Sequence, residues 1–69
     1  MPYPQIKASL IQLLDAIKRA DGPQITLAME RLEQIAAEQR GNLHPQLAHF
    51  LDRRSYAKAL AFVEAQETA

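Results

Sequence analysis

Residues 20–25 read ADGPQI, and this short stretch decides how the chain folds. Gly22 comes where an apolar helical pattern stops, and glycine tolerates the left-handed conformation that commonly follows a helix. Pro23 suits the first turn of a new helix, which Asp21 can cap with Gln24 as its capping-box partner. A connection of two or three residues leaves the flanking helices only an antiparallel hairpin.

The helices on both sides of this turn are predicted from their apolar spacing. The first should run over about 4–20 and the second over about 23–40. Apolar residues three and four apart lie on one face of a helix, and that face packs against a neighbour. The face of the first helix consists of Ile6, Leu10, Leu13, Ile17 and Ala20, with Leu14 at its edge. The face of the second consists of Ile25, Ala28, Met29, Leu32, Ile35 and Ala36.

A second break in the pattern separates the hairpin from the last third of the chain. Gly41 ends the second helix, and Pro45 can open a third helix that Asn42 or His44 caps. The apolar face of this third segment consists of Leu43, Leu47, Phe50 and Leu51.

Arg54 decides where the third helix ends. If the helix continued, this guanidinium would lie in the middle of the apolar face, where burying an unpaired charge is costly. We therefore expect helices over about 45–53 and about 55–67, with Ser55 capping the second of them. The alternative is one bent helix over the same segment. The sequence thus predicts an all-α fold, a small helical bundle in a single domain (1–69), with two short helices folded back across the hairpin.

The size of the chain limits how it can be stabilised. With 69 residues and 7.8 kDa, it should bury only about 60% of its unfolded surface on folding. Small domains usually need disulfides, metals, oligomers or very regular helix packing. The chain has no cysteine, which excludes disulfides and thiolate metal sites. Regular helix packing or self-association is left.

Composition also bears on compartment and partners. The N-terminus lacks the basic start and apolar run of a signal peptide, and no stretch approaches the roughly 18 uninterrupted apolar residues of a membrane span. Nothing indicates an oxidising compartment, so we expect a cytoplasmic protein without a membrane partner. The eight basic and eight acidic residues balance, which argues against a dedicated nucleic-acid binder, because phosphate neutralisation drives such binding.

Three apolar residues do not fit the faces described above. Ile11 lies among charged residues of the first helix, Leu27 lies nearly opposite the face of the second, and Phe62 lies off the apolar line of the fourth. Single exposed apolar side chains are ordinary. The fourth helix, however, carries two apolar faces and four alanines that permit close approach, and such a helix often packs on two sides. Together with the thin core, this predicts binding of a protein partner, with a homodimer favoured.

No residues are predicted to carry chemistry. His44 and His49 are five residues apart, whereas helical metal sites use spacings of three or four. Ser55 is better explained as a helix cap than as a nucleophile, because no base and acid accompany it in a known pattern. We therefore expect no catalytic, cofactor-binding or metal-binding residue, no small-molecule substrate and no enzyme activity.

The string Arg53-Arg54-Ser55-Tyr56 is the most distinctive local feature. Arginine forks beside a helix start can contact an anion or a partner protein. Alternatively, both arginines pair with acids on the second helix, with Arg54 extended over the core edge. A helix-turn-helix nucleic-acid binder would use Arg53, Arg54 and Lys58, but a fourth helix rich in alanine is poorly suited to contact bases.

The leading hypothesis is a small, non-enzymatic protein-interaction or regulatory module that associates with itself through apolar helix faces. The alternative is the helix-turn-helix nucleic-acid binder. The candidate contact residues are Ile11, Leu27, Arg53, Arg54, Tyr56 and Phe62.

Overall fold

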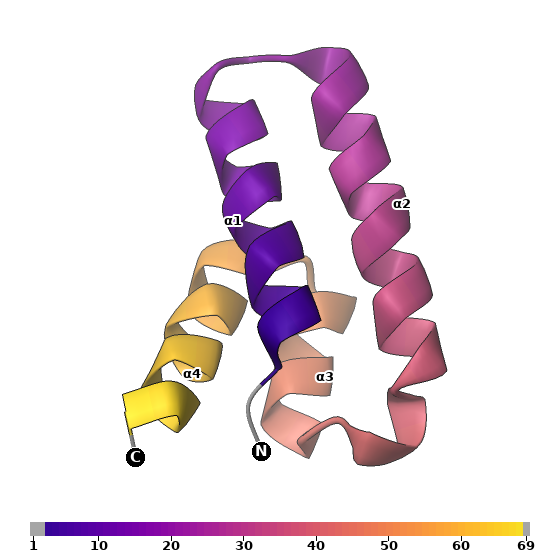
Figure 1. Cartoon of the computed structure of the whole chain (residues 1–69), viewed down its shortest axis with the longest axis vertical. Helices are drawn as coiled ribbons and strands as arrows, with labels where there is room; N and C mark the ends of the chain where they lie inside the picture. The colour runs from indigo at the N-terminus through magenta and orange to yellow at the C-terminus, as the bar shows by residue number, and fades with distance from the viewer. Residues whose placement is uncertain (1–2, 69) are drawn as a thin grey trace.

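A computed structural model describes residues 3–68 and confirms the all-α helical bundle. The helices, shown in Figure 1, are α1 (Pro4–Lys18), α2 (Gly22–Glu38), α3 (Pro45–Asp52) and α4 (Tyr56–Thr68), with a short 3-10 helix η1 (Arg40–Asn42) before α3. The predicted break between the third and fourth helices is confirmed, so the alternative of one bent helix is wrong.

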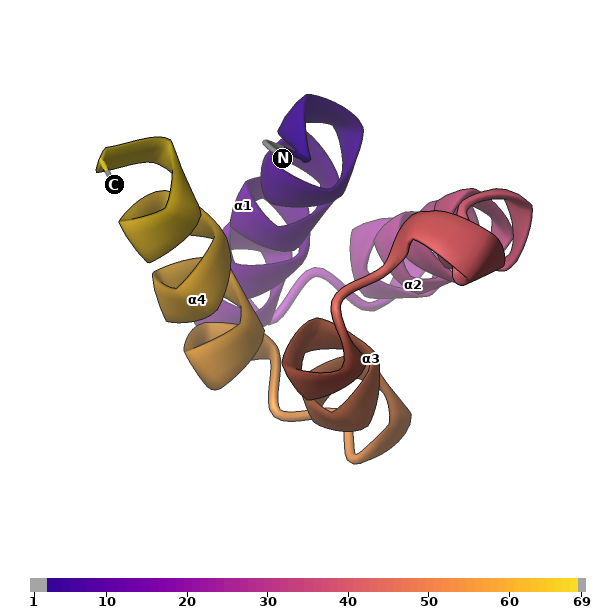
Figure 2. The same ribbon diagram turned by 90° about the horizontal axis from the view of Figure 1, so that it is seen from below.

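The helix α1 is central to the arrangement. It forms an antiparallel hairpin with α2 and also packs against α4, while α3 packs mainly against α4. Figures 1 and 2 show α2 and α4 on different sides of α1. The beginning of α1 and the end of α4 lie at the same end of the molecule, where an ion pair joins Lys7 to Glu67. Thus α4 runs antiparallel to α1.

The turn between α1 and α2 is a Schellman motif, in which a left-handed residue ends a helix. Ala20 has a φ of 56°. The N–H of Ala20 donates to the carbonyl of Ile17, and the N–H of Asp21 donates to the carbonyl of Ala16, both at 3.0 Å. These bonds satisfy carbonyls that the end of a helix leaves without partners. The prediction of Gly22 as the left-handed residue is wrong, because Gly22 is the first residue of α2.

The same motif ends α3. Arg54 has a φ of 57°, its N–H donates to the carbonyl of Leu51 at 3.1 Å, and the N–H of Ser55 donates to that of Phe50 at 2.8 Å. Gly41 lies inside η1, and within residues 3–68 no glycine has a positive φ. The left-handed conformation costs a non-glycine residue roughly 1–2 kcal/mol, and the paired hydrogen bonds and the packing of the reversed chain outweigh this cost.

Two of the predicted helix caps are confirmed. The Asp21 carboxylate accepts a hydrogen bond from the N–H of Gln24 at 3.3 Å. At the start of α3, the Nδ1 of His44 accepts from the N–H of Gln46 at 3.0 Å. Of the two residues that could have capped α3, the structure therefore uses His44 and leaves Asn42 in η1.

The core lies where α1 meets the other three helices. Its members are mostly aliphatic, and all but one were expected from the apolar spacing or lie on its predicted faces. The buried residues of this cluster are Tyr3, Ile6, Leu10, Leu13, Ala28, Leu32, Leu47, Ala59 and Val63.

The buried face of α1 differs from the predicted one at its C-terminal end. Ile17 is 46% exposed and Ala20 is exposed as well, whereas Ala16 is buried. Ala20 leaves the face because it takes the left-handed position of the turn. Ile17 stays uncovered because α4 begins beside the middle of α1 and does not reach its last turn (Figure 1). The prediction that Ile17 and Ala20 belong to the core is therefore wrong.

Tyr3 is a core residue that the apolar spacing did not indicate. Its side chain is buried, and its hydroxyl donates to the carbonyl of Asn42 and accepts from the N–H of His44, both at 3.1 Å. Residues some 40 positions apart are thereby joined. This hydroxyl satisfies backbone groups of the irregular segment between η1 and α3, which helical hydrogen bonds cannot reach.

Candidate protein-interaction surfaces

Among residues 3–67, three large apolar side chains are exposed. Ile11 is 45%, Ile17 46% and Leu27 51% exposed. The expected exposure of Ile11 and Leu27 is confirmed, and Ile17 joins them from the predicted core. Exposed apolar side chains indicate a binding surface only when they form a contiguous patch. The positions of the three relative to one another therefore matter more than their number.

Ile11 and Ile17 belong to one line of side chains along α1. Leu14 lies between them at the same three-residue spacing and is half-buried. Residues three and four apart are neighbours on a helix surface, so the three side chains follow one another along the surface of α1. The spacing of this line is as regular as that of the buried residues of α1. The line runs along the edge of the packed face of α1.

The helix α4 flanks this line. Lys7 lies one turn before Ile11 on α1, and its Nζ is 2.7 Å from Oε1 of Glu67 on α4. On α4, Leu60 lies on the same side of the helix as Glu67, seven residues away, and is half-buried. The side of α4 that carries Leu60 is therefore the side that meets α1 at Lys7. We call the surface formed by Ile11, Leu14, Ile17 and Leu60 the α1–α4 face.

Charged groups border the α1–α4 face at both ends. The hydrogen bond to Glu67 raises the pKa of Lys7 above its ordinary value of 10.5; desolvation opposes this rise, and the carboxylates of Glu67 and Glu64 add to it. At the other end of the line, Lys18 follows Ile17 and is exposed. The basic groups at the two ends of the line therefore lie on α1, and the carboxylates that approach Lys7 lie on α4. The helix α1 also carries Asp15, and α4 carries Lys58.

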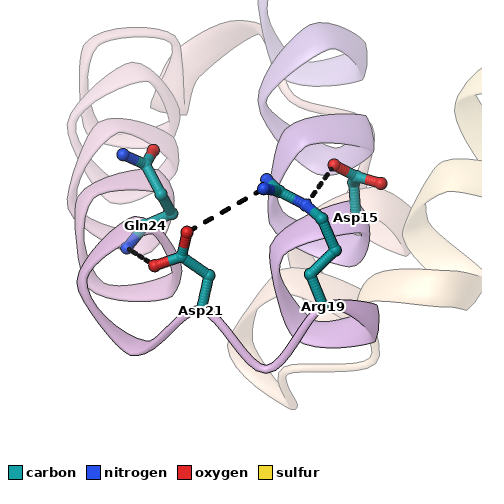
Figure 3. Close-up of polar contacts among 4 residues, drawn as sticks. All are labelled: Asp15, Arg19, Asp21 and Gln24. Atoms are coloured by element: carbon teal, nitrogen blue, oxygen red, sulfur yellow. Dashed lines mark hydrogen bonds and ion pairs between the residues drawn. The ribbon is translucent and has the colours of Figure 1, made fainter.

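Leu27 lies apart from this face. It lines a hollow of about 270 Å³ between α1 and α2 whose other walls are mostly polar. Figure 3 shows the polar network beside it: Nε of Arg19 is 2.9 Å from Oδ2 of Asp15, and Nη1 of Arg19 is 3.9 Å from Oδ2 of Asp21. These contacts tie the end of α1 to the cap of α2. Leu27 is thus a single apolar residue in a polar setting.

Arg54 and Tyr56 line a groove of about 590 Å³ between α2 and α3. The floor of this groove is largely aliphatic and its rim is charged with both signs. The other lining residues are Leu32, Glu33, Ala36, Ala37, Arg40, Leu43, Ala48, Leu51 and Asp52. Arg53 is exposed and does not line the groove.

The arginines do not pair with acids of α2 as one alternative predicted. Within residues 3–68, no ion pair of 4.0 Å or less involves Arg53 or Arg54. The reason is the left-handed turn at Arg54, which ends α3 and leaves both side chains exposed.

Phe62 is accounted for inside the fold. Its ring centroid is 4.9 Å from that of His44 and 6.4 Å from that of Phe50, and it packs against the core cluster. The premise that this side chain lies off the packed surface of α4 is therefore wrong. Phe62 faces α3, a second neighbour that the apolar line of one helix face did not indicate.

Neither a metal site in the described residues nor a similar known protein indicates a function for this chain. Within the described part of the chain, no three side chains of His, Cys, Asp or Glu gather as a metal site would require. None of the helices over residues 3–68 has the length and apolar character needed to cross a membrane. Protein families, curated proteins and solved structures were compared with this chain, and none matches significantly. Any functional conclusion therefore has to come from the surface itself.

The six predicted contact residues do not form one site. Ile11 lies on the α1–α4 face, Leu27 lines the polar hollow, and Arg54 and Tyr56 line the groove. Of the other residues of the α1–α4 face, Ile17 was assigned to the core and Leu14 to its edge. The three-residue spacing of Ile11, Leu14 and Ile17 was present in the sequence, but it competed with an equally regular buried line.

Proposed function

We propose that this chain is a non-enzymatic protein-interaction module that associates with itself through the α1–α4 face. The observation that carries the proposal is the contiguous line of Ile11, Leu14 and Ile17, whose outer members are almost half exposed. A solvated apolar line that continues onto a second helix is the usual mark of an interaction surface rather than of a free one.

The thin core supports self-association. The chain exposes 4720 Å², against roughly 11,000 Å² for an unfolded chain of this mass. Covering part of the α1–α4 face would raise the buried share without any change in fold. For a domain without disulfides, association is one of the few remaining sources of stability.

The expected strength of the dimer follows from the area available. Covering the exposed half of one isoleucine stabilises by about 1 kcal/mol. Two isoleucines in each of two copies therefore contribute about 4 kcal/mol, against roughly 8 kcal/mol for a micromolar complex. The half-buried leucines add less. Association also costs translational and rotational freedom, so we expect a weak dimer that is populated only at concentrations of about 1 mM, where an energy of this size places the dissociation constant.

The test is the molar mass in solution, measured by sedimentation equilibrium from about 10 μM to about 1 mM, a range set by the expected affinity. The wild-type mass should rise from 7.8 kDa towards twice that value, and Ile17→Ser should remain monomeric. Leu27→Ser is the matched control, because Leu27 is at least as exposed but lies off the face. A wild-type mass that stays at 7.8 kDa, or an equal effect of both substitutions, would contradict the proposal.

A second candidate function is nucleic-acid binding by the α3–α4 pair. The observation that favours it is that Arg53, Arg54 and Lys58 are exposed, with both guanidinium groups outside the ion pairs of the described residues. Binding should then be strongest at low salt. A mobility shift at low salt that Arg53→Gln with Arg54→Gln abolishes would support this candidate, and no shift under those conditions would remove it.

A further inference from the structure

The groove between α2 and α3 is separate from the α1–α4 face. Its two walls pack mainly against other helices, α2 against α1 and α3 against α4, as Figure 2 shows. Each wall is therefore held in place by contacts outside the groove, and the space of about 590 Å³ between them exists without a ligand. A site that is formed in advance needs no conformational change when a partner enters it.

The floor of the groove is aliphatic, with alanines beside leucines. On α2, Leu32 is buried and Ala36 is half-buried, and on α3 both Ala48 and Leu51 are half-buried. The two residues of each helix are three or four positions apart, so each pair lies on one side of its helix. Alanine leaves room for the side chains of a third helix, whose apolar line would pack between the two rows, as in helix-in-groove recognition.

Four exposed charged residues border this floor: Glu33, Arg40, Asp52 and Arg54. Within residues 3–68, none of them takes part in an ion pair of 4.0 Å or less. Rim charges contribute mainly orientation and specificity to an interface. These four are therefore available to select and orient a charged partner.

The two signs of charge are distributed unevenly along the groove. Arg40 belongs to η1, at the end where the chain passes from α2 to α3. Glu33 precedes it by seven residues, which is about two helical turns or about 10 Å, and Asp52 ends α3 at the opposite end from η1. Arg54 follows Asp52, and two carboxylates against one guanidinium leave that end with a net negative charge. One end of the groove is thus basic and the other is acidic.

We propose that the groove binds an amphipathic α-helix of another protein. Apolar residues of this helix, spaced as i, i+3 or i+4, and i+7, pack on the alanines and leucines of the floor. A basic residue at one end of its apolar line pairs with Glu33 and Asp52, and an acidic residue about two turns further along pairs with Arg40. A purely apolar helix or a small apolar ligand would leave both carboxylates without a counter-charge.

Two synthetic helical peptides test the charges. Both have the same leucine line; one carries lysine and glutamate two turns apart beside it, and the other carries glutamate at both places. The wild type should bind the lysine–glutamate peptide about tenfold more tightly, as measured by the fluorescence anisotropy of labelled peptide at low salt. Glu33→Lys should abolish or reverse this preference. Glu30→Lys is the matched control and should retain the preference, because Glu30 is also an exposed residue of α2 but does not line the groove.

A second pair of variants tests the floor. Ala37 is exposed and lines the groove, so Ala37→Trp should fill the groove and weaken binding of the lysine–glutamate peptide by about tenfold or more. Gln34→Trp, at an exposed position of α2 that does not line the groove, should bind the peptide as the wild type does. Circular dichroism confirms that every variant is folded.

The outcomes are independent of the α1–α4 face, because Ile17→Ser should bind the peptide as the wild type does. A preference for the lysine–glutamate peptide that Glu33→Lys removes, together with binding that Ala37→Trp removes and both controls retain, establishes the proposal. No binding at peptide concentrations up to about 1 mM, equal affinity for the two peptides, or equal effects in a variant and its control overturns it. Loss of self-association in Ala37→Trp without any peptide binding overturns it as well, because a second copy would then occupy the groove.

Discussion

The two helical hairpins of this molecule are closed by the same turn but differ in what holds them. The α1–α2 turn and the α3–α4 turn have left-handed residues at φ 56° and 57° and equivalent pairs of hydrogen bonds. The first joins helices of 15 and 17 residues, and the second joins helices of 8 and 13. The turn conformation is thus independent of the length of the helices that it connects.

The difference shows that packing, rather than the turn, stabilises each hairpin. The helix α1 has five buried residues, whereas Leu47 is the buried residue of α3. Helices as short as α3 are not stable by themselves in water. Within the α3–α4 hairpin, α3 therefore depends on a few contacts, namely the Leu47 side chain, the Phe62 ring and the Tyr3 hydroxyl, while α1 has redundant ones.

The largest expected effect is the loss of the Leu47 contact. Leu47→Ala should lower the free energy of unfolding by about 2–5 kcal/mol, because it removes a fully buried side chain and leaves a cavity. Urea unfolding measures the loss, and hydrogen exchange should show the amides of α3 opening first. Leu27→Ala, at an exposed site, should change stability by less than about 0.5 kcal/mol. Uniform loss of protection in all helices would show that the hairpins are not separable.

The next effect concerns the hydroxyl that joins the start of the chain to α3. Tyr3→Phe keeps the ring but leaves the N–H of His44 without its acceptor, which should cost about 1–3 kcal/mol. Thermal unfolding compared with the wild type measures it, and hydrogen exchange at His44 should accelerate more than within α2. An unchanged stability would mean that water replaces the hydroxyl and that α3 is held by side-chain packing alone.

The two turns can be compared directly by placing glycine at their left-handed positions. Ala20→Gly and Arg54→Gly should each stabilise the fold by about 0.5–1 kcal/mol, because glycine adopts positive φ without strain. Denaturant midpoints of both variants test whether the turns are equivalent. Gly22→Ala is the comparison at the first residue of α2, where an added methyl group meets open space. Little gain is expected there, because Pro23 follows and disfavours the helical conformation of a non-glycine residue before it. A smaller gain in stability from Arg54→Gly than from Ala20→Gly would show that the Arg54 side chain itself stabilises the fold.

The smallest effect is the pH dependence of the ion pair between α1 and α4. The pKa of Lys7 is raised in the folded chain by its hydrogen bond to Glu67. The stabilisation is therefore fully present below the ordinary value of 10.5 and is lost as pH rises through the higher folded pKa. The difference in melting temperature between the wild type and Lys7→Gln should shrink above about pH 10.5. A difference that stays constant to about pH 12 would contradict this assignment.

Much of the fold could be predicted from local signals. The apolar spacing predicted each helix, and Asp21 and His44 marked helix starts because their side chains accept from nearby N–H groups. The end of α3 followed from the cost of continuing the apolar face through Arg54. Glycine was a misleading signal: the turns use Ala20 and Arg54, since hydrogen bonding in the turn tolerates a left-handed alanine or arginine.

The candidate interaction face was predicted only in part. Ile11 was recognised because it lies among charged residues, but Ile17 was assigned to the core because it continues the line of Leu10 and Leu13. The line of Leu13 and Ala16 is equally regular, and the spacing within α1 cannot rank the two. Phe62 was taken for a misfit for the same reason, because its contact with His44 joins two separate helices.

The amino-acid sequence by itself determined the order of the helices, their approximate ends and the two reversals of the chain, because each depends on interactions within a few residues. Only the tertiary structure decided which line of α1 is buried and which stays exposed. That choice depends on where α4 begins along α1, some 40 residues away in the chain. Burial is a property of the surface that covers a side chain, and for α1 that surface belongs to other helices.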